Sequence, residues 1–388
     1  MKILQICSAR QLGGGEKHLI DLAKALAERG HDVYAAVAPN SPLIAKLTAL
    51  PQQNITQLRL RNALDLPCAL QLARFVRERE IEIIHAHIAR DYMLAAFAAK
   101  RNAAAQLIVT RHVLFPLNKL HKWTFARASR VIAVSQAVAH SLRKAKVVDE
   151  QKITVIHNGI DINRFSSEET SYPEDDLFHQ KPNARGTPLL VGTIGHLGSI
   201  KGHEDFVRAA GIIAAHRSDV NFVIVGEDKS RTGEHRARLE RLIAELKLEA
   251  RVHLIGWIND VASVLRKFDV FVSAARSEPF GLAIVEAMAS GVAVVATMSE
   301  GAREIIEDNV TGKLVPVGDA ETMAHAIDSL LADKHQRETF GARAQLTARE
   351  RFSLECMVDA TEQIYSEALA HERRISNEPR TMSNKNKR

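Results

Sequence analysis

The chain has 388 residues, of which 46% are hydrophobic, 25% charged and 5% aromatic. This composition is typical of globular domains and excludes disorder over most of the chain. The three cysteines, Cys7, Cys68 and Cys356, are far apart in the sequence, which argues against a disulfide framework or a cysteine-based zinc site.

The apolar segments are too short to cross a membrane. The longest covers residues 282–298 and is interrupted by Glu286 and Gly291, whereas a span needs about 20 consecutive apolar residues. The chain starts directly with a strand-like stretch and lacks the apolar region of a signal peptide. We therefore expect a cytoplasmic protein without a transmembrane helix.

The first half alternates strand-length apolar runs with amphipathic helical segments, which predicts βαβ units and a parallel sheet. A strand at residues 3–8 is followed by Gly13-Gly14-Gly15 and a helix at residues 16–29. Glycines at this turn let the backbone approach a phosphate, although a tight turn alone also accounts for them. The other predicted elements are strands at residues 33–38, 83–87, 107–110, 131–134 and 153–156 and a helix at residues 64–79.

Apolar periodicity stops after Phe165 and returns at residue 189. Residues 166–188 are therefore predicted to be a linker between an N-terminal domain, residues 1–165, and a C-terminal domain, residues 189–352. We expect one long helix at residues 353–372, which crosses back to the N-terminal domain, and a disordered basic tail at residues 373–388. The strands predicted in the second domain are residues 189–195, 222–226, 252–256, 270–273 and 292–297.

Both halves thus predict a doubly wound α/β domain. Such sheets bind ligands at the carboxyl ends of their strands. We expect the two domains to face each other across a cleft lined by these ends.

The stretch at residues 277–291 is the most informative about function. It follows a predicted strand and enters a helix, so the N–H groups of Phe280, Gly281 and Leu282 can meet an anion or sugar hydroxyls. Glu278 lies in the loop and Glu286 on the helix, where two carboxylates can accept hydrogen bonds from two sets of hydroxyls. The neighbours of Glu286 are apolar, so its carboxylate needs a specific partner.

The segment from Glu278 to Glu286 resembles the E-x7-E signature of family 4 of the retaining glycosyltransferases, which have the GT-B architecture and use nucleotide sugars. Other landmarks of that family occur in the same order along residues 2–370. They are Gly13-Gly14-Gly15-Glu16, Gly30-His31-Asp32-Val33, His157-Asn158-Gly159-Ile160-Asp161 with Phe165, Lys201-Gly202, and residues 310–315.

The resemblance implies a role for each donor-binding residue. Glu286 would bind the ribose of the nucleotide, and Glu278 the donor sugar. Lys201 would neutralise the diphosphate, which also meets backbone donors of the N-terminal glycine loop. The remaining implied donor-binding residues are Gly14, Gly15, His196, Trp257, Ile258, Phe280, Gly281 and Leu282.

The resemblance also implies which residues act on the transferred sugar and the acceptor. His112 matches a histidine that similar enzymes place beside the transferred sugar, so the implied catalytic residues are His112, Lys201 and Glu278. Glu16 and His87 are the candidates for acceptor contact.

One position departs from the family pattern, because His196 stands where an arginine is usual, five residues before Lys201. Arginine is always charged and binds phosphate through two nitrogens, whereas histidine titrates near neutrality. Arg276 is a candidate to compensate. The departure leaves open a sugar- or nucleotide-binding protein without turnover, and a sugar-nucleotide epimerase on the same architecture is a further alternative.

No metal-ligand set is predicted. The sequence has no H-x-x-x-H pair, and Asp175-Asp176 lies in the predicted linker. His85 and His87 are expected on opposite faces of their strand, and therefore not to hold one ion together. The resemblance likewise implies metal-independent transfer without a cofactor, the nucleotide sugar being a substrate.

The acid-free span at residues 92–148 carries ten basic residues and predicts an anionic partner or a solvated basic face. Within it, residues 117–127 interleave basic residues with Leu, Trp and Phe, as a membrane-interfacial helix does. An ordinary core helix with solvated basic residues is the alternative. The basic residues of the span are Lys100, Arg101, Arg111, Lys119, Lys122, Arg127, Arg130, Arg143, Lys144 and Lys146.

The resemblance implies a retaining hexosyltransferase with UDP-sugar as the favoured donor. Together with the basic span, it leads us to expect a cell-envelope glycan or lipid-linked acceptor, as in lipopolysaccharide synthesis. The enzyme would be peripheral at the inner face of the plasma membrane and would not bind nucleic acid.

Overall fold

The computed structural model describes residues 1–59, 65–117, 119, 121–166 and 188–377, and it divides into two compact units. The first unit contains residues 1–156 and the chain from residue 357 onward, and the second contains residues 157–356. The N-terminal domain was predicted to extend to residue 165. Residues 157–166 instead group with the second unit, where Ile160 N donates to Phe352 O at 3.0 Å. Most of the predicted linker, residues 167–187, lies outside the described residues.

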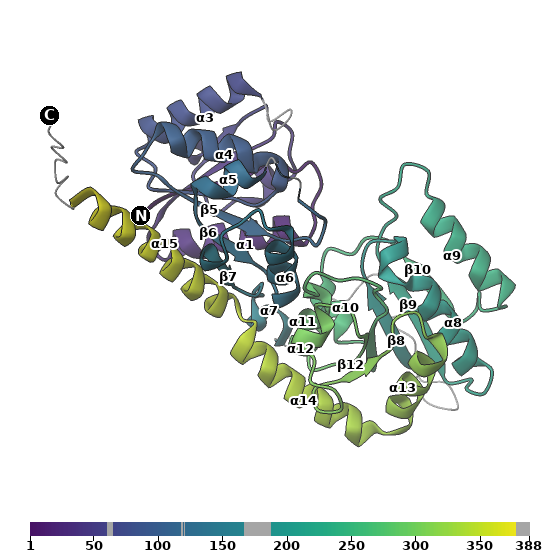
Figure 1. Ribbon diagram of the computed structural model, residues 1–388. Coiled ribbons are helices and arrows are strands. Elements are labelled where there is room, and N and C mark those ends of the chain that lie inside the picture. The colour runs from purple at the N-terminus through teal and green to yellow at the C-terminus, as the bar shows by residue number, and fades with distance from the viewer. Residues whose placement is uncertain (60–64, 118, 120, 167–187, 378–388) are drawn as a thin grey trace, which may run out of the picture. The chain divides into compact units, whose positions relative to one another are not determined.

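Within its described residues, the first unit contains a seven-stranded parallel sheet with the order β3-β2-β1-β4-β5-β6-β7. Helices α3, α4 and α5 cover one face, and α1 lies on the other (Figure 1). The strands are β1 Lys2–Cys7, β2 Asp32–Val37, β3 Ile55–Gln57, β4 Ile83–Ala86, β5 Gln106–Arg111, β6 Ala128–Ala133 and β7 Ile153–Val155. The helices are α1 Gly14–Glu28, α2 Leu43–Lys46, α3 Leu66–Glu78, α4 Ala89–Arg101, α5 His121–Arg127 and α6 Gln136–Ala145, followed much later by α15 Leu354–Asn377.

The described part of the second unit has a six-stranded parallel sheet with the order β10-β9-β8-β11-β12-β13. The strands are β8 Leu189–Ile194, β9 Val220–Val225, β10 Val252–Ile255, β11 Val270–Ser273, β12 Ala293–Thr297 and β13 Lys313–Val315. The helices are α7 Ile162–Ser166, α8 His203–Ala214, α9 Glu234–Glu245, α10 Val261–Leu265, α11 Leu282–Ala289, α12 Ala302–Ile305, α13 Ala320–Ala332 and α14 Lys334–Arg351.

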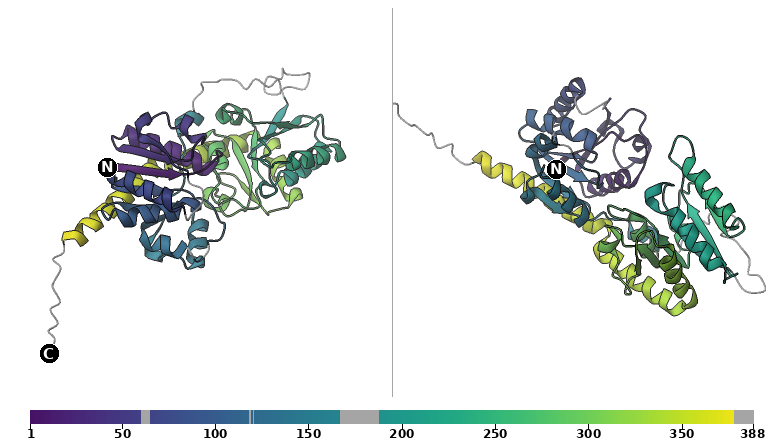
Figure 2. Two further views of the ribbon diagram at one scale, coloured as in Figure 1. Left: turned by 90° about the horizontal axis from the view of Figure 1, so that it is seen from above. Right: turned by 45° about the vertical axis from the view of Figure 1, so that its right-hand side comes forward.

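Both faces of the second sheet are buried, as a parallel sheet requires. Val270 and Val272 of β11 join one apolar cluster with side chains of α8, α9 and α13. Phe271, between them, is also fully buried but points to the opposite face. The views in Figure 2, with Figure 1, show α8 and α9 on one side of this sheet and α11 on the other. The predicted α/β class with two doubly wound sheets is confirmed.

From residue 357 onward, the C-terminal helix α15 belongs to the first unit and packs within it. Glu362 binds Arg29 and His31 at the end of α1, and Tyr365 is fully buried. The helix was predicted to end at residue 372 with a disordered tail from 373, but it continues to Asn377. No proline or glycine interrupts it before Pro379. The tail from residue 378 lies outside the described residues. None of the described helices is long and apolar enough to cross a bilayer.

Each sheet has a topological switch point, where the strand order reverses. It lies between β1 and β4 in the first sheet and between β8 and β11 in the second. Loops that follow these strands leave a crevice at the carboxyl edge, where ligands of such folds bind. Most of the predicted site residues lie in these loops or in the helices that they enter.

Candidate active site

The loops after β8 and β11 bring a lysine and a glutamate together in the second unit. Lys201 Nζ donates to Glu278 Oε2 at 2.6 Å, and the two side chains are only 22% and 16% exposed. Both line one small hollow, together with His203 and Gly281. The structure thus joins two predicted site residues that are 77 positions apart.

Gly202 holds these two loops at close range. Its φ is +67°, and a Cβ there would lie 1.9 Å from Ala274 O. No other residue type fits without moving the backbone, because both the left-handed conformation and the contact exclude a side chain. The glycine after Lys201 therefore sets the approach of that lysine to Glu278.

The loop that carries Glu278 is fixed by backbone contacts with Gly301 and by a buried aromatic side chain. Gly301 N donates to Glu278 O at 2.8 Å, and a Cβ at Gly301 would lie 1.9 Å from Phe280 O. Phe280 is buried and stacks on His157 with ring centroids 5.7 Å apart. Its side chain therefore anchors the loop.

The start of α11 follows this loop directly. Gly281 is its N-cap residue with φ +116°, and Leu282 begins the helix. Amide N–H groups of a first helical turn have no partner within the helix and can bind an anion. Glu286 lies one turn further on the same helix and is 8% exposed.

Other predicted donor-binding residues are not gathered at this hollow. Trp257 and Ile258 follow β10, which is at the edge of the sheet, and Trp257 is 56% exposed with its Nε1 donating to Asn259 Oδ1 at 3.1 Å. A nucleotide base that reached Trp257 would have to extend along the sheet edge past β9.

His196 follows β8 but does not act as a cation there. Burial, together with the positive charges of Lys201 and Lys229, lowers the pKa of His196 below its ordinary value. Its ring is therefore neutral at pH 7. Arg276, the predicted compensating residue, is instead bound by Asp205, with its Nη2 3.0 Å from Asp205 Oδ2.

His203 belongs to the site but was not predicted. It is the first residue of α8, is buried, and lines the hollow beside Lys201. Its Nδ1 has no hydrogen-bond partner within the described chain, and burial lowers the pKa of the ring to about 3. The available signal was its position immediately after the Lys201-Gly202 pair.

In the first unit, the glycine loop lies against a histidine. A Cβ at Gly15 would be 3.3 Å from His112 Cγ, so the start of α1 contacts the residue that follows β5. Gly14 begins this helix, and Glu16 is in its first turn. The predicted residues Gly14, Gly15, Glu16 and His112 are thus neighbours.

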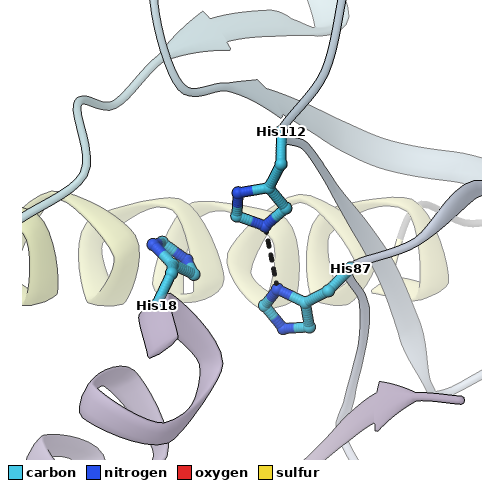
Figure 3. A group of neighbouring side chains, drawn as sticks. All are labelled: His18, His87 and His112. Carbon is cyan, nitrogen blue, oxygen red and sulfur yellow. Dashed lines mark hydrogen bonds between the residues drawn. The ribbon is translucent and has the colours of Figure 1, made fainter. Parts of the chain in front are cut away.

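Three imidazoles meet beside this contact. His18 of α1, His87 after β4 and His112 after β5 each place one ligand nitrogen so that all three nitrogens lie within 4.8 Å of one another (Figure 3). This group was not predicted, because its members are far apart in the sequence. Figure 3 also shows a hydrogen bond within the group, between His112 Nε2 and His87 Nδ1 at 3.5 Å.

The expectation that His85 and His87 face opposite sides is wrong. Their ring centroids are 4.2 Å apart. Residues two apart on a strand share a face, since side chains alternate with a period of two.

A chain of hydrogen bonds fixes these rings. His87 Nε2 donates to Gln5 Oε1 at 2.7 Å, and Gln5 Nε2 donates to the Tyr365 hydroxyl at 3.4 Å. That hydroxyl is hydrogen-bonded to His85 Nδ1 at 2.6 Å, and His85 Nε2 is hydrogen-bonded to Thr110 Oγ1 at 2.6 Å. Helix α15 is thereby linked to the histidine group through Tyr365.

Burial keeps the histidine rings neutral. It lowers the pKa of His85, His87 and His112 well below the ordinary value, and neighbouring histidines lower it further. Close by, burial raises the pKa of Asp91 to about 6, although Ser8 donates two hydrogen bonds to its carboxylate.

Comparison with known proteins decides the family. The family model described as Glycosyltransferase Family 4 matches residues 12–164, and the one described as Glycosyl transferases group 1 matches residues 174–347. The lipopolysaccharide core biosynthesis mannosyltransferase LpcC of Rhizobium leguminosarum is 30% identical over 306 residues, which are 78% of this chain and 79% of that protein. The chain belongs to glycosyltransferase family 4.

Two further likenesses cover almost the whole glycosyltransferase. N-acetyl-alpha-D-glucosaminyl L-malate synthase of Bacillus anthracis is 26% identical over 379 residues, 92% of this chain and 95% of that protein. The structure of HepE from Anabaena in complex with UDP-glucose has 26% identity and a TM-score of 0.79, covering 96% of this chain and all of that one. The glycosyltransferase is therefore a transferase with the GT-B architecture.

Proposed function

We propose that this glycosyltransferase transfers a sugar from a UDP-sugar to a hydroxyl of a cell-envelope glycan or lipid-linked acceptor, with retention of the anomeric configuration. The observation that carries the proposal is the Lys201–Glu278 pair at the start of α11, at the point where the second sheet reverses its order. The UDP-glucose complex of HepE supports the donor class, and the name of LpcC supports the envelope acceptor.

The second unit holds the donor in this proposal. The diphosphate pairs with the Lys201 ammonium and accepts hydrogen bonds from the backbone amides of Gly281 and Leu282. Glu278 and Phe280 lie beside the sugar. Negative charge grows on the diphosphate as the bond to the sugar breaks, so these donors stabilise the transition state more than the ground state.

Glu286 and the edge of the sheet hold the nucleoside. The buried carboxylate of Glu286 accepts hydrogen bonds from the ribose hydroxyls. The base extends toward Trp257 and Ile258 after β10. His196, being neutral, contributes a hydrogen bond rather than a charge.

Retention follows from attack on the same face of the sugar from which the diphosphate leaves. The bond from the anomeric carbon to the phosphate oxygen breaks, and the bond to the acceptor oxygen forms. The acceptor proton passes to the departing phosphate. No metal ion is needed for this step, because Lys201 and the amides at the start of α11 balance the charge.

The first unit holds the acceptor. Glu16 and His87 contact its hydroxyls, His112 contacts the transferred sugar, and the amides of Gly14 and Gly15 donate to the diphosphate. The neutral ring of His112 can accept or donate a hydrogen bond to a hydroxyl. His87 can only accept one, through Nδ1, because its Nε2 donates to Gln5.

Peripheral association with the inner face of the plasma membrane is part of the proposal. Phe115 is 72% exposed and Trp123 is 40% exposed, and Lys122 and Arg127 beside them are exposed as well. Apolar side chains flanked by basic ones are typical of surfaces that bind anionic lipid. Phe125 is buried and fixes α5 to its unit, so the exposed residues face away from the core.

A thermal-shift screen tests the donor assignment. UDP, GDP and ADP and their sugars are each added to the protein, since a ligand that binds the native state raises the melting temperature by mass action. We expect UDP and a UDP-sugar to give the largest shifts. Larger shifts with GDP or ADP would overturn the choice of base.

A further inference from the structure

The three imidazoles of His18, His87 and His112 have the spacing of a metal site. Two nitrogens bound to one tetrahedral zinc ion at about 2.0–2.1 Å lie about 3.3 Å from each other. His87 Nδ1 and His112 Nε2 are 3.5 Å apart, so these two rings are already close to the required geometry. A turn of the His18 side chain completes the set, because all three ligand nitrogens lie within 4.8 Å.

The orientation of His87 is fixed in the manner of a metal ligand. Its Nε2 donates to Gln5 Oε1 at 2.7 Å, so the proton is on Nε2 and the lone pair of Nδ1 faces the other two rings. Metal-binding histidines commonly donate their second nitrogen to an oxygen acceptor, which fixes the tautomer and increases the basicity of the ligand nitrogen.

His112 can also adopt the tautomer of a metal ligand. Its Nδ1 has no hydrogen-bond partner among the described residues, so this nitrogen can carry the proton while Nε2 binds an ion. The neighbouring positive charge of Arg111 opposes a cation.

The ligand chemistry selects the ion. Three imidazoles without a carboxylate suit borderline-soft divalent ions, above all zinc, whereas magnesium and calcium prefer oxygen ligands. His112 is partly exposed, which gives an ion a path to the group. Three protein ligands leave a fourth position for water or a hydroxyl.

We infer that His18, His87 and His112 form a zinc-binding site in the first unit. Zinc on His112 removes that ring from contact with a sugar. Inhibition of sugar transfer by the ion is therefore expected; this consequence rests on the proposed function.

Binding is measured first without reference to activity. Untagged protein is stripped with a chelator and titrated with Co²⁺, whose visible absorption reports four-coordinate binding, and Zn²⁺ is then added as a competitor. We expect one Co²⁺ per chain, displaced by Zn²⁺. His112→Gln and His18→Gln should each weaken binding at least about tenfold, whereas His140→Gln, at an exposed position on α6, should leave it unchanged. Saturable binding that is equal in all three variants would overturn the site, as would the absence of binding to the wild type.

A measurement on the wild type keeps the test independent of how the variants fold. Diethyl pyrocarbonate modifies accessible histidines, and mass spectrometry locates the modified residue. We expect Zn²⁺ to protect His112 and to leave His140 as reactive as before. Equal modification of His112 with and without Zn²⁺ would contradict the inference.

Activity then tests the consequence. Zn²⁺ should inhibit transfer by the wild type, and His18→Gln, which has no role in the proposed reaction, should remain active but lose sensitivity to Zn²⁺. Inhibition of both proteins at the same concentration would contradict the link between the site and the reaction. If no transfer is found with any donor, the proposed function fails while the Co²⁺ titration still decides the site.

Discussion

Lys201 Nζ lies 2.6 Å from Glu278 Oε2, and both residues line the same hollow although they are 77 positions apart in the sequence. The carboxylate pairs with the ammonium in the free protein. On the proposed function, the donor diphosphate takes over this cation and leaves Glu278 to accept hydrogen bonds from the sugar hydroxyls.

Loss of the lysine charge should affect the reaction rate more than donor binding. We expect Lys201→Ala to lower kcat by a larger factor than it raises the donor Kd, because the charge that it meets grows during bond breaking. Single-turnover rates and calorimetric donor binding measure the two effects. Lys334→Ala, at an exposed position on α14, is the matched control. A variant with weaker donor binding and an unchanged rate would contradict the role in the transition state.

Glu286 should determine nucleotide affinity. Glu286→Gln removes a charged acceptor for the ribose hydroxyls, which is worth about 1.5–3 kcal/mol, or roughly 10- to 150-fold in Kd. Titration of UDP into the wild type and the variant measures this change. Glu245→Gln, on the exposed side of α9, should bind UDP as the wild type does. Unchanged affinity in a folded Glu286→Gln protein would remove the ribose assignment.

Stability should fall as the pH drops below about 6.5. Desolvation holds the pKa of His85, His87 and His112 well below the ordinary value, so below pH 6.5 the unfolded chain binds protons that the folded chain excludes. Each contributes a slope of up to about 1.4 kcal/mol per pH unit. Asp91 opposes them, because its pKa is raised to about 6 and the folded chain binds the extra proton there.

Melting temperatures between pH 7.5 and pH 5 measure the balance. It should favour the histidines, because three imidazoles with a lowered pKa outnumber the two described carboxyls whose pKa burial raises, Asp91 and Asp269. His112→Gln should reduce the pH dependence, and His140→Gln should not. A melting temperature that is constant or higher at pH 5 would show that the buried rings do not govern acid stability.

The exposed aromatic residues of the first unit should govern attachment to anionic lipid. We expect the wild type to sediment with anionic vesicles at low salt and to be released at high salt, since the attraction of each basic residue is screened. Phe115→Ser and Trp123→Ser should weaken sedimentation, and Leu346→Ser, an exposed apolar position of the second unit, should not. Equal partitioning of wild type to neutral and anionic vesicles would contradict the membrane proposal.

The alternation of strands and helices could be predicted because both sheets are buried on two faces and their strands are continuous apolar runs. Short strands at the edge of a sheet could not be predicted in the same way. Strand β3, Ile55–Gln57, has three residues at the edge of the first sheet and no apolar run to mark it. Helix α15 continues five residues beyond its predicted end, because the residues after 372 are polar and basic and have no apolar periodicity that marks a helix.

The Glu278 loop and Lys201 could be predicted because each lies in a local motif with a recognisable spacing. The histidine group could not, since His18, His87 and His112 come together only through the order of β1, β4 and β5 in the sheet. The ion pair between Arg276 and Asp205 could not be predicted either, because Asp205 is on α8 and the contact depends on how two loops pack.

Product analysis is the most direct measurement of the proposed reaction. The protein is incubated with a UDP-sugar and an envelope acceptor in the presence of EDTA, and the products are followed by NMR spectroscopy. We expect one UDP for each new glycosidic bond, an anomeric configuration equal to that of the donor, and no loss of rate in EDTA. A product with inverted configuration, a new nucleotide sugar without free UDP, or activity that requires added magnesium or manganese would contradict the proposal.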